Sequence, residues 1–247
     1  AAEWEARDGR APVLYLRSFS ADAVTAEAAE SFGGRTEEEL TVDAFGGVGP
    51  VVAIGRPGEP LPEVGAARLY VGDAQWQEVV AGYMGRASLV VLRLGETMGF
   101  WWELERSGRT LDPTGLVILT PYDRAQYELF RAQAKAPFPR PLPDFQESRA
   151  KRLLGGRLGT LRGLIWFEAD WTPHYVDLSC AAWPWRTAFF FLGHNRLYKK
   201  LLWSLRPVYA QRAAAWKARP RWGRALGVAA GLCVIAVFVP SVLRGPA

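Results

Sequence analysis

Residues 88–105 read Ser-Leu-Val-Val-Leu-Arg-Leu-Gly-Glu-Thr-Met-Gly-Phe-Trp-Trp-Glu-Leu-Glu, and this stretch decides the fold. Its first part is an almost unbroken apolar run, which is typical of a strand covered on both faces in a parallel sheet. A glycine-containing turn follows, and residues 99–109 then have the pattern of a helix that opens with aromatic side chains and carboxylates. Ligands of parallel α/β sheets bind where strands end and helices begin. We therefore expect any functional site at this corner.

Similar apolar runs, with helical patterns between them, lie on both sides of this stretch. Thr36 and Glu39 form a capping-box pattern for a helix that ends at Gly46. Asp73 is expected to cap a helix over residues 74–84. The order of the segments predicts an α/β fold with a doubly wound, mainly parallel five-stranded sheet of about 170 residues. The other expected elements are strands at residues 12–16, 51–54, 115–120 and 163–168, an optional short strand at 68–71, and a helix at 122–134.

The C-terminal part of the chain has a different composition. Seven of the eleven tryptophans lie between Trp166 and Trp222, and residues 199–224 contain basic but no acidic side chains. This pattern favours an amphipathic helix over residues 196–206 that lies on anionic lipid. Residues 225–243 carry no charge over 19 positions, and a membrane span needs about 20 apolar residues. A buried core helix is the alternative interpretation of that segment.

The charges around residues 225–243 predict the orientation of such a span. Three arginines precede it within residues 219–224, whereas only Arg244 follows it. By the positive-inside rule the folded domain then lies on the cytoplasmic side of the inner membrane. The lipid bilayer is the expected partner, and nucleic acid is not expected. The predicted division is an α/β domain at 1–172, a basic, aromatic membrane-proximal region at 173–220, and a single-pass C-terminal anchor and tail at 221–247.

Two glutamates on the helix after residue 95 are the candidate catalytic groups. Glu103 and Glu105 are two positions apart, so they point to nearly opposite sides of a helix and only one can face the ligand edge. A glutamate in a partly dry pocket beside Trp101 and Trp102 can orient a sugar hydroxyl or stabilise a cationic transition state. Glu103 is the first choice and Glu105 the second. The alternative is a pair of carboxylates that stabilises the helix through its macrodipole.

Cationic and glycine residues at the strand ends are the candidate phosphate-binding groups. Guanidinium groups and backbone amides of glycine-rich loops hold phosphate well. Each position has an ordinary structural alternative: short Gly/Pro loops are often plain turns, and strand-end arginines often form ion pairs, as Arg93 could with Glu96. The candidate set is Arg17 and Ser18 after the first strand, Gly55, Arg56 and Gly58 after the second, Arg93 in the central stretch, and the two tryptophans above.

Several common chemistries lack their sequence signals. His174 and His194 are the only histidines, and neither a metal site nor a Ser-His-Asp triad is predicted around them. No phosphate-binding GxxxxGK[ST] or GxGxxG motif follows a strand, which disfavours ordinary ATP or Rossmann-type NAD binding. Two cysteines in unlike surroundings predict no disulfide framework. No bound cofactor is therefore expected.

These residues together resemble a group of bacterial membrane proteins with TIR-like (Toll/interleukin-1 receptor-like) domains. The resemblance covers a little under half of the chain and implies a TIR- or flavodoxin-like fold. In enzymatic TIR domains a glutamate near a tryptophan serves in breaking the nicotinamide–ribose bond of NAD. Trp101 and Glu105 have the usual TIR spacing, whereas the membrane group centres on Trp102 and Glu103. The shared segments are residues 12–19, 49–59, 65–70, 76–80 and 99–104.

The resemblance leaves three functions open. The first is a membrane-tethered enzyme that handles a nucleotide, with NAD as the substrate. The second is a non-enzymatic signalling scaffold, because many TIR domains are pure interaction modules. The third is a sensor that binds a nucleotide without turning it over. Self-association through the α/β domain is compatible with each of them.

Overall fold

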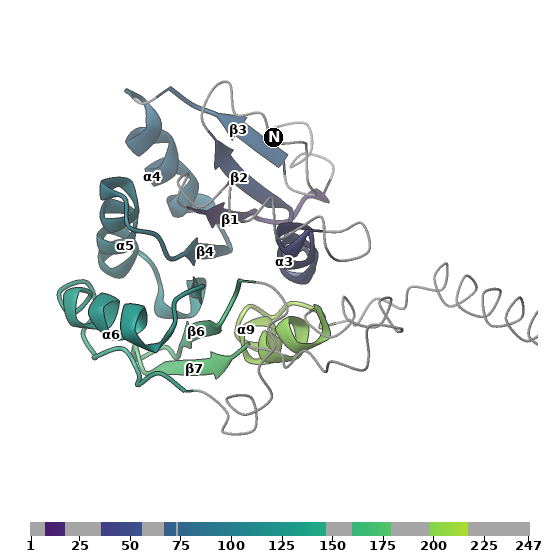
Figure 1. The fold of residues 1–247 in the computed structure, drawn as a ribbon. Coiled ribbons are helices and arrows are strands. Elements are labelled where there is room, and N and C mark those ends of the chain that lie inside the picture. Colours follow the sequence, from purple (N-terminus) through teal and green to yellow (C-terminus); the bar gives the residue numbers. More distant parts are fainter. Residues whose placement is uncertain are drawn as a thin grey trace, which may run out of the picture. The chain divides into compact units, whose positions relative to one another are not determined.

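The computed structural model of the 247-residue chain describes residues 8–17, 36–55, 67–72, 74–146, 160–178 and 198–216. Their central feature is one sheet with the strand order β3-β2-β1-β4-β5-β6-β7 (Figure 1). The first five strands in this order are parallel to one another, whereas β6 is antiparallel to both β5 and β7. The strands are β1 (Val13–Leu16), β2 (Val51–Gly55), β3 (Ala67–Tyr70), β4 (Leu89–Arg93), β5 (Leu116–Thr120), β6 (Gly163–Phe167) and β7 (Pro173–Asp177).

Helices cover both faces of this sheet (Figure 1). Alternate residues of each strand point to opposite faces. Leu14 and Leu16 pack in one core layer with α4, α5 and α6, while Val13 and Tyr15 pack in the other layer with α3 and α9. The helices are α3 (Glu37–Phe45), α4 (Trp76–Arg86), α5 (Met98–Thr110), α6 (Arg124–Gln133) and α9 (Arg206–Gln211), with a 3-10 turn, η2 (Pro113–Gly115), before β5.

The helix starts follow from local capping chemistry. The predicted capping box of Thr36 and Glu39 is present on α3. Asp123 and Gln126 form a second capping box on α6, which therefore begins at residue 124 and not at 122 as predicted. Helix α4 begins at Trp76, two residues later than predicted, and Gln75 at its N-cap makes no side-chain capping bond.

The α/β class and the mostly parallel sheet are confirmed, but the sheet is larger than predicted. It has seven strands among the described residues, where the sequence analysis expected five. The optional strand at 68–71 is β3, and the expected strand at 163–168 is β6, which runs antiparallel. Strand β7 was not predicted because its sequence, Pro-His-Tyr-Val-Asp, is half-buried at a sheet edge and lacks an apolar run.

Residues 198–216 belong to the same compact unit as the sheet. Leu201, Leu205 and Tyr209 are buried in the core layer that also contains α3. The Tyr209 hydroxyl donates to the Ala44 carbonyl oxygen, and the Arg212 Nε donates to the Ser88 carbonyl oxygen. Leu201 and Leu205, which were predicted to lie on lipid, thus pack against the sheet, whereas Trp203 is exposed.

No helix among the described ranges has the length and apolar character that a membrane span requires. The segment predicted to span, residues 225–243, lies outside those ranges. The anchor and the location at the inner membrane stay predictions.

Candidate functional site

The chain changes faces of the sheet between two neighbouring strands. It passes from β1 to α3 on one face and from β4 to α5 on the other, while β1 and β4 pair in parallel. The carboxyl ends of β1 and β4 are therefore the topological switch point, where open α/β sheets bind their ligands. The sequence placed Arg17 and Arg93 at these two strand ends.

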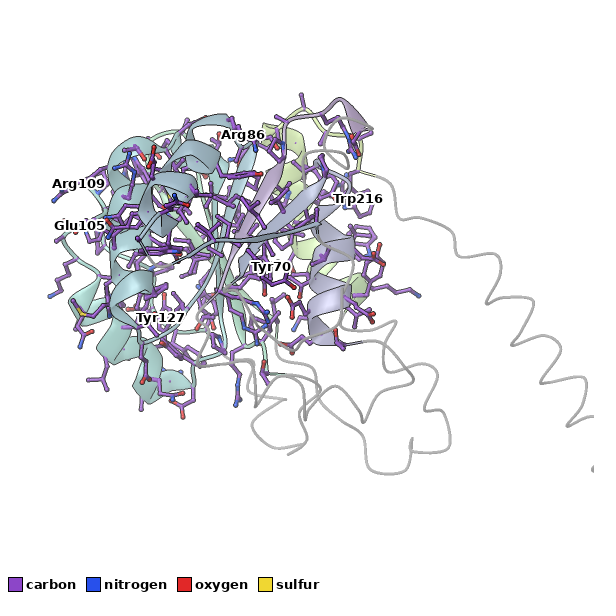
Figure 2. The ribbon with its side chains drawn as sticks, turned by 90° about the horizontal axis from the view of Figure 1, so that it is seen from above. Tyr70, Arg86, Glu105, Arg109, Tyr127 and Trp216 are labelled. Carbon is purple, nitrogen blue, oxygen red and sulfur yellow. The ribbon has the colours of Figure 1, made fainter. Side chains whose placement is uncertain are left out.

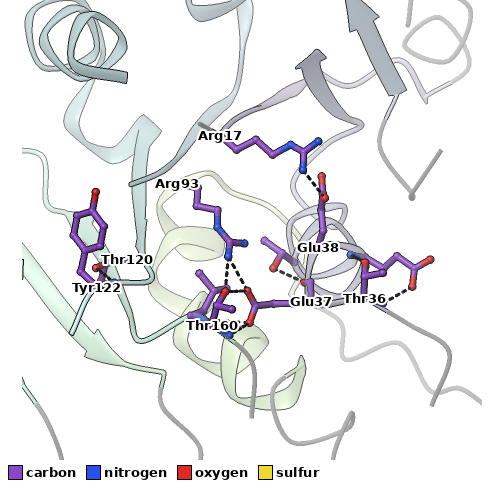
Figure 3. Close-up of polar contacts among 11 residues, drawn as sticks. Arg17, Thr36, Glu37, Glu38, Arg93, Thr120, Tyr122 and Thr160 are labelled. Carbon is purple, nitrogen blue, oxygen red and sulfur yellow. Dashed lines mark hydrogen bonds and ion pairs between the residues drawn. The ribbon is translucent and has the colours of Figure 1, made fainter. Parts of the chain in front are cut away.

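Two ion pairs occupy the α3 side of this switch point (Figure 3). An Arg17 nitrogen lies 2.9 Å from a Glu38 oxygen, and an Arg93 nitrogen lies 3.0 Å from a Glu37 oxygen. All four side chains are largely buried. Arg93 therefore pairs with α3 and not with Glu96. We call Arg17, Glu37, Glu38, Arg93 and Thr160 the carboxyl-edge cluster.

The Glu37 carboxylate accepts four hydrogen bonds within this cluster (Figure 3). Its Oε2 accepts from the backbone amides of Thr160 and Leu161 at 2.5 and 3.1 Å. Its Oε1 accepts from the Thr160 hydroxyl at 2.6 Å and from the Arg93 Nη2 at 3.0 Å. Arg93 Nη2 also donates to the Thr160 hydroxyl oxygen at 2.6 Å. The site thus holds an anion by amides, a hydroxyl and a guanidinium together.

Two polar groups of the switch point have no hydrogen-bond partner. They are the Tyr15 hydroxyl on β1 and the Arg93 Nε on β4, which lack a partner beyond the contact of the two side chains with each other, and both residues are more than nine-tenths buried. Burial raises the pKa of Tyr15, so the phenol keeps its proton. Burial opposes the charge of Arg93, but Tyr15 and Glu37 beside it raise its pKa overall, so Arg93 is a cation. The Tyr15 hydroxyl, which keeps its proton, is therefore available as a donor beside the Arg93 cation.

Glu103 lies on the other side of the sheet, in the second turn of α5. Thr97 starts this helix by accepting from the Phe100 amide at 3.2 Å. Glu103 is 6% exposed, and burial raises the pKa of its carboxyl to about 8. No charged or hydrogen-bonding partner offsets that burial among the described residues. At neutral pH most Glu103 carboxyls are consequently protonated and can donate a hydrogen bond.

One turn further along α5, the Ser107 hydroxyl is also fully buried without a partner. Residues four apart lie on the same face of a helix. Glu103 and Ser107 therefore lie side by side on the inward face of α5, and the Ser107 hydroxyl is unsatisfied. A group of this kind in a native core calls for an explanation beyond packing.

The two tryptophans beside Glu103 pack between helices. Trp101 lies against Phe130 of α6 with ring centroids 5.8 Å apart, and Trp102 lies against Trp76 of α4 at 5.0 Å. Glu105 is exposed and pairs with Arg109 one turn on, at the outer surface (Figure 2). The structure therefore separates the two glutamates: Glu103 faces the core and Glu105 faces solvent.

The predicted site residues fall into two groups. Arg17 and Arg93 meet in the carboxyl-edge cluster on the α3 side, and Gly55 ends β2 next to it in the sheet. Trp101, Trp102 and Glu103 belong to the core layer on the opposite side. Ser18, Arg56 and Gly58 lie outside the described residues.

Sequence reasoning missed the partners of the two arginines. The sequence pattern gave a role to Thr36 and Glu39 only, and none to Glu37, Glu38 or Thr160. Three consecutive glutamates after a cap, together with arginines at two strand ends, were the available signal.

The described part of the chain contains no group of His, Cys, Asp or Glu side chains that could hold a metal ion. No protein-family model, curated protein or solved structure matches this chain.

Proposed function

We propose that this protein binds a nucleotide at the carboxyl edge of its sheet, at the switch point between β1 and β4. The observation that carries the proposal is Arg93, a buried cation in contact with the buried Tyr15 hydroxyl, whose own O–H has no acceptor. Guanidinium groups match the geometry of phosphate oxygens and hold them strongly when buried. The position agrees with the general rule for ligand sites in open α/β sheets.

The finer proposal is that the nucleotide is NAD and that the domain, as a TIR-like enzyme, hydrolyses its nicotinamide–ribose bond. In that reaction the C–N bond breaks, nicotinamide leaves with the electron pair, water adds to the ribose carbon, and the proton that water loses is released to solvent. Glu103 supports this proposal as a buried carboxyl on the helix after the central strand β4. Because it lies on the opposite side of the sheet from the carboxyl-edge cluster, the proposal requires that NAD span the carboxyl ends of β1 and β4. When protonated it donates to a ribose hydroxyl, and a developing cation nearby favours its carboxylate form.

The test is nicotinamide release from NAD by the full-length protein in detergent or lipid nanodiscs. We expect turnover by wild type, a loss of at least 100-fold for Glu103→Gln, and no more than a twofold change for Glu105→Gln. Glu105 is the matched control because it lies on the same helix but pairs with Arg109 at the surface. No release by wild type at high protein density would remove the enzymatic proposal.

Binding is tested separately from turnover. Titration calorimetry of the full-length protein with ADP-ribose reports nucleotide binding whether or not the bond is cleaved. We expect saturable binding that Arg93→Gln weakens at least tenfold. Binding without turnover would identify a sensor, and no binding at all would overturn the proposed function.

A non-enzymatic scaffold is the second candidate, and a specific observation favours it. Arg17 and Arg93 are each matched by a glutamate of α3, and Trp101 and Trp102 both contact neighbouring helices. These contacts also serve an ordinary structural role. Wild type that self-associates in light scattering but binds no ADP-ribose would support the scaffold.

The membrane tether is also a proposal, supported by the 19 uncharged residues at 225–243 and the arginines before them. Deletion of residues 221–247 should give a protein that is recovered without detergent. Full membrane retention of the deleted protein would move the anchor to residues 183–203.

A further inference from the structure

The Glu37 carboxylate lies where the carboxyl-edge cluster concentrates its hydrogen-bond donors. We propose that the backbone amides of Thr160 and Leu161, the Thr160 hydroxyl and the Arg93 guanidinium form a phosphate-binding site that Glu37 occupies in this structure. This inference rests on the proposed function, because a nucleotide supplies the phosphate. It adds which groups would hold that phosphate and which residue must leave.

The donor geometry is that of an anion site. Two successive backbone amides converge on Oε2 of Glu37, at 2.5 and 3.1 Å. A hydroxyl and a guanidinium converge on Oε1, at 2.6 and 3.0 Å. Successive backbone N–H groups of this kind form concavities that bind phosphate in other proteins. Two oxygens of a phosphate group can take the places of the two carboxylate oxygens.

The site has donor capacity that Glu37 leaves unused. Arg93 Nε and the Tyr15 hydroxyl are buried next to the occupied Nη2, and beyond the contact of the two side chains with each other neither has a partner. A carboxylate has only two oxygens, and each oxygen of Glu37 already accepts two hydrogen bonds. A phosphate group has a further oxygen, which these two donors could bind. The surplus favours a larger anion than the one present.

The location of Glu37 makes it a competitor for the ligand. It is the first residue of α3, directly after the Thr36 cap. Rotation of this side chain, or movement of the first turn of α3, would free the donors. Phosphate entry and release of the Glu37–Arg93 pair are then coupled, so ligand binding would change how α3 is held against β4. The competing explanation is that Glu37 is a permanent structural cross-link.

The experiment is rescue of thermal stability by inorganic phosphate. The full-length protein in detergent is compared as wild type, Glu37→Ala and Glu38→Ala, with phosphate or with chloride at equal ionic strength. Glu38 is the matched control because it is the next residue of α3 and pairs with the other arginine, Arg17, at 2.9 Å. Both substitutions should lower Tm, since each leaves a buried arginine without its carboxylate.

Phosphate should restore Tm only where the site has been vacated. At a phosphate concentration ten times its Kd, we expect Glu37→Ala to gain roughly 3–6 °C over chloride. Wild type and Glu38→Ala should gain no more than about 1 °C on the same scale. A phosphate effect that is equal in the two alanine variants would overturn the inference.

A second variant covers the case in which Glu37→Ala does not fold. Glu37→Gln keeps the size of the side chain but removes its charge, so phosphate displaces it more easily. Its Kd for ADP-ribose, measured by calorimetry, should be at least tenfold lower than that of wild type. If wild type binds ADP-ribose and the Kd of Glu37→Gln is unchanged, the inference is wrong, but the proposed function is not contradicted. Absence of ADP-ribose binding by both would instead count against the proposed function.

Discussion

Burial of Glu103 without a partner links a single residue to the stability of the whole domain. The pKa of its carboxyl is about 8 in the folded protein, against an ordinary value of 4.5. Between these values the folded state holds a proton that the unfolded state has lost. Stability from this group is therefore greatest below about pH 4.5 and falls as pH rises towards about 8.

Glu103→Gln should remove that pH dependence. The substitution is expected to raise the free energy of unfolding at pH 8 by on the order of 3 kcal/mol and to change it little at pH 4. Urea unfolding at several pH values measures the effect. The exposed Glu105→Gln should leave the pH profile unchanged. If Glu103 is a site residue, the substitution that stabilises the fold also abolishes activity. This trade-off is typical of sites whose function requires a residue that lowers the stability of the fold.

Individual residues at the site were partly predictable. Arg17, Arg93 and Glu103 were singled out because strand ends and first helical turns are recognisable in a sequence. The partners of Arg93 were not, since Glu37 is 56 positions away from it and Thr160 is 67 positions away. Only the packing of α3 and of the segment before β6 against the strand ends brings them together.

Glycines within two helices show how element packing decides the effect of one substitution. A Cβ at Gly108 of α5 would lie 2.3 Å from the Pro137 carbonyl oxygen, and a Cβ at Gly82 of α4 would meet nothing within 4 Å. Backbone atoms cannot move aside cheaply. Gly108 is therefore required by the close approach of α5 to the chain after α6, whereas Gly82 is not.

Alanine at the two positions should have opposite effects. Gly108→Ala is expected to cost about 1–3 kcal/mol by overpacking. Gly82→Ala should stabilise the protein by about 0.5–1 kcal/mol, because alanine has the higher helix propensity. Thermal melting followed by circular dichroism measures both. Equal destabilisation by the two substitutions would contradict the packing described for α5.

At the scale of elements, patterns with a purely local cause were predicted well. The capping box of Thr36 and Glu39 is present because it needs only residues three apart. The strand β6 was located, but its antiparallel direction was not predicted, since direction depends on where the chain re-enters the sheet. The proline-rich connection from α6 to β6 gave no local signal for that.

For the whole molecule, residues 198–216 complete one core layer. Leu201, Leu205 and Tyr209 bury their side chains under β1, β4 and β5. Arg212 holds the end of this segment by donating to Ser88 at 2.6 Å and pairing with Asp112 at 3.2 Å. The sheet face is incomplete without these side chains.

Two truncations test this layer. Removal of residues 217–247 should shift Tm by no more than about 2–4 °C, the change that 1 kcal/mol produces in a domain of this size. Removal of residues 198–247 should abolish cooperative unfolding, because each buried leucine contributes about 1.5–3 kcal/mol and a whole domain has only about 5–15 kcal/mol. Cooperative melting of the shorter protein would show that the layer is dispensable.

The apolar runs and capping residues determined by themselves that this is an α/β protein with a mostly parallel sheet, because strand burial and helix starts depend on residues near one another in the chain. The tertiary structure decided the size of the sheet, the direction of its last strands and the burial of residues 198–216. It also decided that Arg93 holds Glu37 and that Glu103 lies in the core. These features depend on contacts between segments that are distant in the chain, and the pattern of a short stretch of sequence does not predict such contacts.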